Sequence, residues 1–321
     1  MPRILVITPV RHIAGVPEVL ESAGEVTYLD DPEPSEVIGQ ISSYDAIFTN
    51  PNKSRVYIGE EILSAGNLKA ICTASTGTNH IDKKAAAARN IAVLSLTEQR
   101  EVINRISSTA ELAFALTMAQ LRKVLWSHAG ALGGEWDYTH YIGRQLNSLT
   151  VGVIGYGRLG SLYAGYCRAF GAQVLVYDPY KKVDRADISQ LATIEELFER
   201  SDVISIHVHV SPETTNMIHA ASFARMKKDV LLINTARGEI INESDLVGFL
   251  KNNPEARAGV DVLADEIKNR LNSPLLDYAK SGRQVVITQH IGGMTREAQE
   301  IAYGHAARML HSFLRGSANP V

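Results

Sequence analysis

Short apolar segments of strand character alternate with helical segments along most of the chain, and this alternation restricts its possible folds more than any other feature. In the first hundred residues the strand-like segments are residues 3–10, 25–30, 44–51, 68–75 and 91–96. Polar or helical segments, such as residues 17–24, separate them. Strands that alternate with helices form parallel sheets with helices on both faces. We therefore predict a doubly wound α/β domain here.

A second alternating block begins near Leu149. Its six strand candidates are residues 149–155, 172–178, 202–210, 229–236, 256–263 and 284–292. Six such strands make a complete dinucleotide-binding sheet of the Rossmann type. The chain is thus predicted to be α/β, with two doubly wound parallel-sheet domains.

Two long helical segments flank the second block. Residues 107–132 have apolar positions at helical spacing on more than one side, with Ser107 or Ser108 as a cap, so we expect this helix to pack against more than its own domain. Residues 295–316 form an amphipathic helix that is expected to return to the first domain. We accordingly predict a flavodoxin-like domain of residues 1–98 and 294–321, with a Rossmann domain of residues 99–293 inserted in it.

Composition excludes several classes of protein. The 321 residues, 45% hydrophobic and 21% charged, suit two globular domains. A net charge of -3 with interspersed signs predicts neither nucleic acid nor membranes as partners. Cys72 and Cys167 lie in apolar runs and are expected to be buried free thiols, and no Cys/His cluster suggests a metal site. With neither a membrane-length apolar run nor a signal-peptide pattern at the start, a cytoplasmic protein is expected.

A glycine motif opens the second block. Gly155, Gly157 and Gly160 form a G-x-G-x-x-G pattern between a predicted strand and a predicted helix, and Asp178 ends the next strand. Glycines allow a tight turn and close approach to a pyrophosphate, which the helix N-terminus attracts. An acidic residue at about this spacing accepts hydrogen bonds from the adenosine ribose. The motif predicts a dinucleotide cofactor, and the Asp favours NAD over NADP.

Three polar residues follow successive strand ends of the same predicted sheet. Arg237 follows residues 229–236, Glu266 follows residues 256–263, and His290 lies in the last strand segment. Each alone would be taken for an ordinary surface group. Parallel sheets bind ligands beyond their carboxyl strand ends, where an Arg can hold a carboxylate and a His beside a carboxylate can exchange protons. We predict that the three form a catalytic site.

The sequence resembles the D-isomer-specific 2-hydroxyacid dehydrogenases over nearly its whole length. The most specific segments are residues 151–160, 226–246, 259–266 and 288–293. The resemblance implies an enzyme that interconverts a D-2-hydroxy acid and its 2-keto acid with NAD, with Arg237, Glu266 and His290 as its catalytic residues. His290 would exchange the hydroxyl proton, Glu266 would orient it, and Arg237 would bind the substrate carboxylate.

The resemblance also assigns the remaining site residues. Asp261 would hold the nicotinamide amide, and the cofactor site would further include Thr76, Arg158, Leu159, His207, Thr235 and Gly293. A loop at residues 73–82 resembles the family's substrate loop, in which Ser75, Thr76 and Gly77 would bind the substrate carboxylate. The loop after residues 44–51 carries Asn52, Lys53 and Arg55, which would suit a second anionic group such as a phosphate.

The chain departs from the family pattern at three places. His209 stands where a proline beside the nicotinamide is usual, and Gln289 replaces the proline before the catalytic His. Ser75 and Asn79 stand in the substrate loop where Gly and Asp are common. No catalytic group is lost, but the changes at His209 and in the substrate loop leave the substrate open. D-3-phosphoglycerate is one candidate, and a glyoxylate or hydroxypyruvate reductase is another.

Two further alternatives are considered. A formate-dehydrogenase-like activity is disfavoured, because those enzymes resemble this chain but pair the His with Gln rather than Glu266. A regulatory NAD-binding protein of the same fold would act through partner surfaces, and turnover of a 2-keto acid would exclude it. Residues 125–143 carry Trp126, Trp136, Tyr138 and Tyr141, aromatics favoured at interfaces, and the corresponding region forms the family's dimers, so a homodimer is expected.

Overall fold

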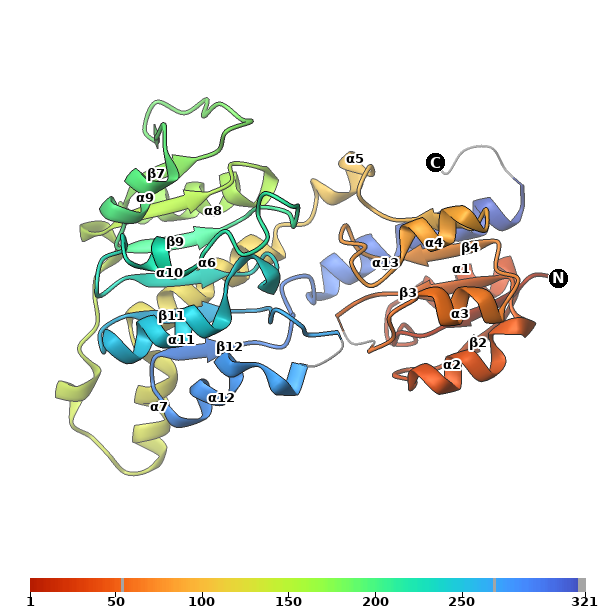
Figure 1. The fold of residues 1–321 in the computed structure, drawn as a ribbon, viewed down its shortest axis with the longest axis horizontal. Helices are drawn as coiled ribbons and strands as arrows, with labels where there is room; N and C mark the ends of the chain where they lie inside the picture. The colour runs from red at the N-terminus through yellow and green to blue at the C-terminus, as the bar shows by residue number, and fades with distance from the viewer. Residues whose placement is uncertain (53–54, 268–269, 317–321) are drawn as a thin grey trace. The chain divides into compact units, whose positions relative to one another are not determined.

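A computed structural model describes residues 1–52, 55–267 and 270–316, which divide into two compact units (Figure 1). The first unit contains residues 1–106 and the segment that begins at Gly293, and the second contains Ser107–Gly292. The second unit is thus inserted in the first. In the structure, residues 99–106 belong to the first unit, whereas the sequence analysis assigned them to the inserted domain. The predicted boundaries of the substrate-binding and NAD-binding domains, at residues 98 and 294, stay a prediction.

The first unit is built on a five-stranded parallel sheet. Its strand order is β2-β1-β3-β4-β5, which is the flavodoxin-like order. Every predicted strand segment contributes one of its strands: β1 (Arg3–Val6), β2 (Glu25–Tyr28), β3 (Ala46–Thr49), β4 (Ala70–Thr73) and β5 (Ala92–Leu94). All residues of β3 and β4 are buried, as continuous apolar strands in the centre of a covered sheet should be.

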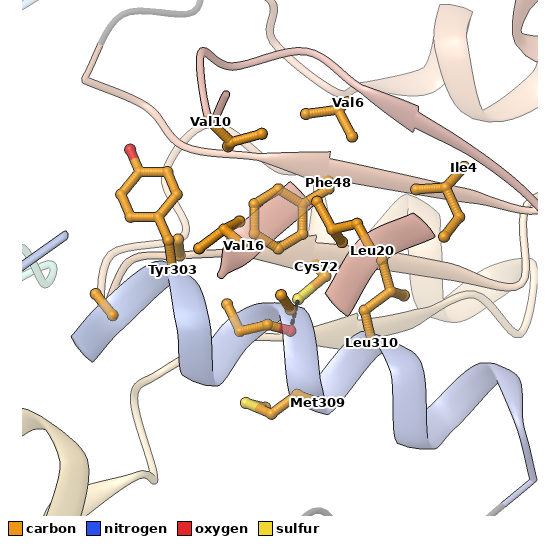
Figure 2. Close-up of a cluster of buried hydrophobic side chains, with 14 of the residues drawn as sticks. Ile4, Val6, Val10, Val16, Leu20, Phe48, Cys72, Tyr303, Met309 and Leu310 are labelled. Atoms are coloured by element: carbon orange, nitrogen blue, oxygen red, sulfur yellow. Dashed lines mark hydrogen bonds between the residues drawn. The ribbon is translucent and has the colours of Figure 1, made fainter. Parts of the chain in front are cut away.

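Helices cover this sheet, and the last helix of the chain completes its core. The helices of this unit are α1 (Val16–Ala23), α2 (Pro34–Gln40), α3 (Glu60–Ala65), α4 (Lys83–Ala88), α5 (Arg100–Ile103) and α13 (Arg296–Leu314), with a 3-10 turn η1 (Ile41–Ser43). Figure 2 shows Tyr303, Met309 and Leu310 of α13 in the same buried cluster as Phe48 and Cys72. The predicted return of the C-terminal helix is confirmed.

The second unit is built on a seven-stranded parallel sheet in the order β12-β11-β10-β9-β6-β7-β8. Numbered within the unit this is 3-2-1-4-5-6, the Rossmann order, with a seventh strand added. Six strands match the predicted segments: β6 (Thr150–Ile154), β7 (Gln173–Tyr177), β9 (Val203–Ile206), β10 (Leu231–Asn234), β11 (Arg257–Val260) and β12 (Val285–Ile287). The two-residue edge strand β8 (Ser189–Gln190) is exposed and was not predicted.

The helices of the second unit lie on both faces of its sheet (Figure 1). They are α6 (Ser108–Leu121), α7 (Val124–Leu132), α8 (Arg158–Ala169), α9 (Ile194–Arg200), α10 (Ala220–Phe223), α11 (Glu243–Asn252) and α12 (Pro274–Ser281). Four 3-10 turns complete the unit: η2 (Tyr138–Tyr141), η3 (Leu146–Ser148), η4 (Gly238–Ile240) and η5 (Arg270–Asn272).

The single long helix expected over residues 107–132 is wrong in one respect. Lys123 adopts a left-handed conformation with φ 51°, which ends α6 and starts α7 in a new direction. The α6 helix packs on α8, β10 and β11, whereas none of the residues of α7 is buried. The apolar residues of this segment therefore belong to two helices: those of α6 pack in the core, and those of α7 are at least partly exposed.

Two expectations from composition can be compared directly with the structure. Cys72 and Cys167 are both buried and free, as predicted. In the described ranges, the structure has no helix with both the length and the apolar character that crossing a membrane requires.

Candidate active site

The three predicted catalytic residues all lie in the second unit, just beyond neighbouring strands of its sheet. Arg237 follows β10, Glu266 follows β11, and His290 follows β12. Because these parallel strands are adjacent, their carboxyl ends lie at one edge, where open α/β sheets bind ligands. The sheet order therefore collects three side chains that are far apart in sequence.

His290 and Glu266 form a direct pair. His290 Nδ1 lies 2.6 Å from Glu266 Oε1, and only 14% and 18% of the two side chains are exposed. The other carboxylate oxygen, Oε2, accepts a hydrogen bond from the Leu263 N–H at 3.3 Å. A carboxylate on Nδ1 holds the proton there in the neutral imidazole, so Nε2 is the nitrogen that can exchange a proton with a ligand.

The electrostatic surroundings keep Glu266 charged. Burial alone would raise the pKa of its carboxyl group. The hydrogen bond and charge of His290, the Leu263 N–H and the positive charge of Arg237 outweigh burial and hold this pKa below its usual range. Glu266 is therefore a carboxylate at neutral pH, which suits it to orienting an imidazole and stabilising its protonated form.

Arg237 is fixed by the turn that follows β10. Its Nη1 donates to the Ala236 carbonyl at 2.6 Å, and its own carbonyl accepts from Asn234 Nδ2 at 2.8 Å. The next residue, Gly238, lies so close to the Leu263–Ala264 backbone that a Cβ there would come within 2.0 Å of the Leu263 carbonyl carbon. The Arg237 turn and the loop that carries Glu266 are thus in direct backbone contact.

His290 sits in a left-handed backbone conformation, with φ 55°. This is uncommon for residues other than glycine, and it requires support from the surroundings. Asp261 supplies that support: its carbonyl accepts from the His290 N–H, and its carboxylate accepts from the N–H groups of Ile291 and Gly292, each at 2.8 Å. Thr288 also donates to this carboxylate. Asp261 therefore holds the turn that presents His290; its predicted contact with nicotinamide stays a prediction.

The glycine motif forms the expected turn between β6 and α8. Gly155 has φ 91°, and a Cβ on Gly160 would lie 2.0 Å from the Gly155 carbonyl oxygen, so both positions require glycine. Gly157 is the N-cap of α8, and among the described residues no atom beyond its own chain neighbours would lie within 4 Å of a Cβ there. Arg158 and Leu159 form the first turn of α8, and Leu159 packs on the core. The start of α8 is thus open to an anionic group.

Asp178 lies just beyond β7 and is tied to the glycine turn. Its Oδ2 accepts from the Tyr156 N–H at 2.7 Å, and its Oδ1 accepts from the N–H groups of Tyr180 and Lys181 at 2.8 and 3.0 Å. The carboxylate is therefore fixed beside the turn, in the position expected of a ribose-binding acid.

The other residues predicted around the cofactor lie beyond β9, β10 and β12. His207 packs its backbone against Gly155, while its Nε2 is 2.8 Å from Ser205 Oγ, and burial lowers the pKa of His207 to about 3, so its ring is neutral. His209 is exposed, and its carbonyl accepts from Thr214 Oγ1. Thr235 is buried after β10, and in the part of the chain that the structure describes its hydroxyl has no hydrogen-bond partner. A Cβ on Gly293 would meet no atom within 4 Å.

The predicted substrate loop follows β4 in the first unit. Ser75 Oγ donates to the Gly77 carbonyl at 2.6 Å and pairs with Thr73 Oγ1 at 2.9 Å, while Thr97 donates to the Thr76 carbonyl. Among the described residues, the main-chain N–H groups of Thr76 and Gly77 donate no hydrogen bond. Adjacent N–H groups of this kind are suited to a carboxylate.

The residues proposed for a second anionic group give a mixed result. Asn52 donates its N–H to Asn50 Oδ1 at 2.9 Å, which fixes the turn after β3. Arg55 forms ion pairs with Asp31 and Glu33 at 3.3 and 2.8 Å, so its charge is already balanced. Lys53 lies outside the described residues.

Two groups near the predicted site were not found from the sequence. Gly238 follows Arg237, and its close backbone contact can be recognised only in three dimensions. Glu243 is a buried acid at the start of α11. Acidic residues are common in the first turn of a helix, so the sequence did not indicate that this one is buried near the site. A cavity of about 650 Å³ lies elsewhere, in the first unit between α5 and α13, and none of the predicted site residues lines it.

The chain belongs to the D-isomer-specific 2-hydroxyacid dehydrogenase family. Residues 114–292 match the model of that family's NAD binding domain, which is more than half of the chain and nearly all of the second unit. The family suggested by the sequence motifs is therefore confirmed, together with NAD as the cofactor of this domain.

Similarity to individual proteins extends over both units. The chain is 34% identical over 300 residues to a D-3-phosphoglycerate dehydrogenase of Archaeoglobus fulgidus and 32% identical over 299 residues to one of Mycobacterium leprae; each match covers 92% of this chain and 54% of the relative. This chain thus spans about half the length of these relatives. A crystal structure of D-lactate dehydrogenase from Aquifex aeolicus, complexed with NAD and lactic acid, matches 99% of this chain and 97% of its own, with a TM-score of 0.84 and 26% identity.

Proposed function

We propose that this protein is an NAD-dependent oxidoreductase that interconverts a D-2-hydroxy acid and its 2-keto acid. The observation that carries the proposal is the 2.6 Å pair of His290 and Glu266, next to Arg237, beyond three adjacent strands of a dinucleotide-binding sheet. The names of the relatives and the family agree with this chemistry.

The chain's own residues fit NAD. The left-handed Gly155 and the open position at Gly157 leave room for a pyrophosphate at the N-terminus of α8, where the helix dipole attracts anions. The fixed carboxylate of Asp178 suits a ribose diol better than a 2′-phosphate, because like charges repel. When bound, NAD supplies the nicotinamide that accepts or donates the hydride.

Each catalytic residue has a definite role in this proposal. Arg237 binds the substrate carboxylate and polarises the C2 oxygen, since a guanidinium stays charged and can hold a carboxylate through two bonds. His290 Nε2 takes the hydroxyl proton during oxidation and returns it during reduction. Glu266 keeps the proton on Nδ1 and stabilises the imidazolium. In the first unit, the N–H groups of Thr76 and Gly77 remain the predicted donors to a substrate carboxylate.

A screen of 2-keto acids with NADH tests the proposal. We expect NADH to be consumed with at least one small 2-keto acid, and the His290→Gln variant, which keeps a polar side chain, to bind NADH without consuming it. NADH binding without turnover of any 2-keto acid would instead favour a regulatory NAD-binding protein.

For the substrate we propose D-3-phosphoglycerate, with 3-phosphohydroxypyruvate as the keto acid. The names of several relatives support this choice, although the chain covers only about half of their length. The test compares kcat/KM for 3-phosphohydroxypyruvate, hydroxypyruvate and glyoxylate, followed by Lys53→Ala. Equal use of the unphosphorylated acids, or an unchanged KM for the phosphorylated acid in Lys53→Ala, would favour a glyoxylate or hydroxypyruvate reductase.

We also propose that the protein is a homodimer, assembled through residues 125–143. This segment exposes large apolar side chains that a monomer would leave in water, including Leu132 at 77%, Trp136 at 91% and Ile142 at 64% exposure. Light scattering at micromolar concentration should give the dimer mass, and Trp136→Asp should give the monomer mass. Tyr180→Asp is the matched control, because Tyr180 is 79% exposed outside this segment. A wild-type monomer would contradict the proposal.

A cytoplasmic location remains our proposal as well. The two buried cysteines are free thiols, as is usual in reducing compartments. Cell fractionation would test it, and recovery in an oxidising compartment would contradict it.

A further inference from the structure

Glu243 makes two hydrogen bonds that bracket the loop carrying Glu266. It is the first residue of α11 and only 8% exposed. Its Oε1 accepts from the Ala264 N–H at 2.8 Å, and its Oε2 accepts from Ser273 Oγ at 2.6 Å. Ala264 lies just before Glu266, and Ser273 is the N-cap of α12, where the loop ends. One buried carboxylate thus binds both ends of this loop.

The surroundings show that this is a specific arrangement rather than a solvated acid. Ser273 Oγ also accepts from the Leu276 N–H at 3.1 Å, so its proton is committed to Glu243 while its lone pair caps α12. The Leu263–Ala264 peptide is pressed against Gly238 on the opposite loop. A buried carboxylate without its donors would carry a large desolvation cost, so Glu243 requires the loop in this position.

Resting on the function proposed above, we propose that Glu243 is a positioning residue that sets the place of Glu266, and through it the orientation of the His290 ring. It touches neither reacting atom in this scheme. Glu243 acts on Glu266 through its hydrogen bond with the Ala264 N–H, because this bond fixes the backbone just before Glu266. Its hydrogen bond with Ser273 fixes the other end of the same loop. A catalytic group displaced by about 1 Å can lose about 10²-fold in rate.

Three variants separate positioning from simple stability. Glu243→Ala removes both bonds, and we expect kcat to fall about 10- to 100-fold while the Kd for NADH stays within about twofold. Glu243→Gln can keep both bonds, with its carbonyl toward Ala264 and its amide toward Ser273, and should recover most of the activity. Asp245→Asn is the matched control, because Asp245 lies on the same helix but accepts from the Ala220 N–H of α10; its kcat should be unchanged.

The decisive measurement is a double-mutant cycle with Glu266→Gln. If Glu243 acts through Glu266, adding Glu243→Ala to Glu266→Gln should lower kcat by less than about twofold more. The pH profile of Glu243→Ala should move toward that of Glu266→Gln. Fully additive losses, or a wild-type kcat and pH profile in Glu243→Ala, would overturn the proposal.

A second readout does not depend on turnover. The NMR chemical shifts of the His290 ring, measured in the full chain at one pH, should move in Glu243→Ala toward those of Glu266→Gln and stay at the wild-type values in Asp245→Asn. If Glu243→Ala does not fold, Ser273→Ala is the variant to measure, and it should give a smaller shift in the same direction. A protein without keto-acid turnover would refute the proposed function, whereas unchanged chemical shifts of the His290 ring would refute the role of Glu243.

Discussion

The two parallel sheets carry different kinds of groups beyond the carboxyl ends of their strands. In the second unit, β7, β10, β11 and β12 are followed by the ionisable side chains of Asp178, Arg237, Glu266 and His290. In the first unit, the first polar residues after β1, β3 and β4 are uncharged: Thr8, Asn50 and Ser75, with the N–H groups of Thr76 and Gly77 nearby. The charge of Arg55, farther along the loop after β3, is balanced by Asp31 and Glu33. Neutral groups can orient a substrate but do not exchange protons near pH 7. Under the function proposed above, the second sheet would carry the chemistry and the first sheet the recognition of the substrate.

The largest test of this division is His290→Ala. Losing the group that exchanges the proton should lower kcat by about 10³-fold or more, at the upper end of what general acid–base catalysis contributes. NADH binding should remain, because His290 lies beyond β12, away from the glycine turn. Stopped-flow turnover and a fluorescence titration with NADH measure the two effects. A kcat near that of the wild type would remove the basis for assigning the chemistry to the second unit.

Asp178 tests whether the second unit also selects the cofactor. We expect kcat/KM for NADH to exceed that for NADPH by about 10²-fold, because a carboxylate held by three N–H groups cannot turn away from a 2′-phosphate. In Asp178→Ser the preference should fall mainly through better use of NADPH. Lys181 and Lys182 lie nearby in sequence, so Lys182→Ala serves as a control for their charge. Equal use of both cofactors by the wild type would contradict the assignment.

Ser75→Ala tests the first unit. Its hydroxyl joins Gly77 and Thr73, so its loss should loosen the substrate loop without touching the proton-transfer pair. One net hydrogen bond is worth about 0.5–1.5 kcal/mol, so KM for the keto acid should rise by about 2- to 10-fold at unchanged kcat. Ser22→Ala is the control, because it removes an exposed hydroxyl that donates to the Val19 carbonyl within α1, outside the substrate loop. A loss of kcat at constant KM would mean that the first unit shares in the chemistry.

The smallest expected effect comes from protonation of His207, and it changes the stability of the fold rather than the reaction rate. Burial lowers its pKa to about 3, while an unfolded chain has the ordinary value of about 6.5. Between these values the unfolded chain binds more protons, so stability is lost as the pH falls from about 6.5 toward 3. Lowering the pH from 6.5 to 5 should cost roughly 1–2 kcal/mol through this residue.

The measurement compares urea unfolding of the wild type and His207→Gln at pH 7.5 and 5. The variant should lose less stability on acidification. His305→Gln is the counterpart in the first unit, where burial also lowers the pKa of His305. An acid sensitivity that His207→Gln does not change would show that the buried imidazole makes no such contribution.

Sequence reasoning located most strands of both sheets and placed Arg237, Glu266 and His290 beyond three of them, but it did not reveal the contacts that support these residues. Eleven predicted strand segments became strands because short, continuous apolar runs suit strands that are buried on both faces of a parallel sheet. The strand β8 was missed because Ser189–Gln190 is polar and exposed, and the break at Lys123 carries neither Gly nor Pro. Arg237, Glu266 and His290 were found because each follows a recognisable strand. Glu243 begins a helix instead, and its partners Ala264 and Ser273 lie 21 and 30 positions away in sequence, so no local pattern indicated its contacts.

The insertion of one unit in the other has a consequence for the order in which the protein folds during synthesis. The buried cluster in Figure 2 joins Ile4, Val6 and Phe48 to Tyr303, Met309 and Leu310. The first sheet is therefore translated early, but the face that it shares with α1 stays only partly covered until α13 has left the ribosome. The second unit is continuous in sequence and can close its core before then. The half that is translated first is thus expected to be the last to become resistant to protease, and the nascent first sheet is the segment most in need of a chaperone.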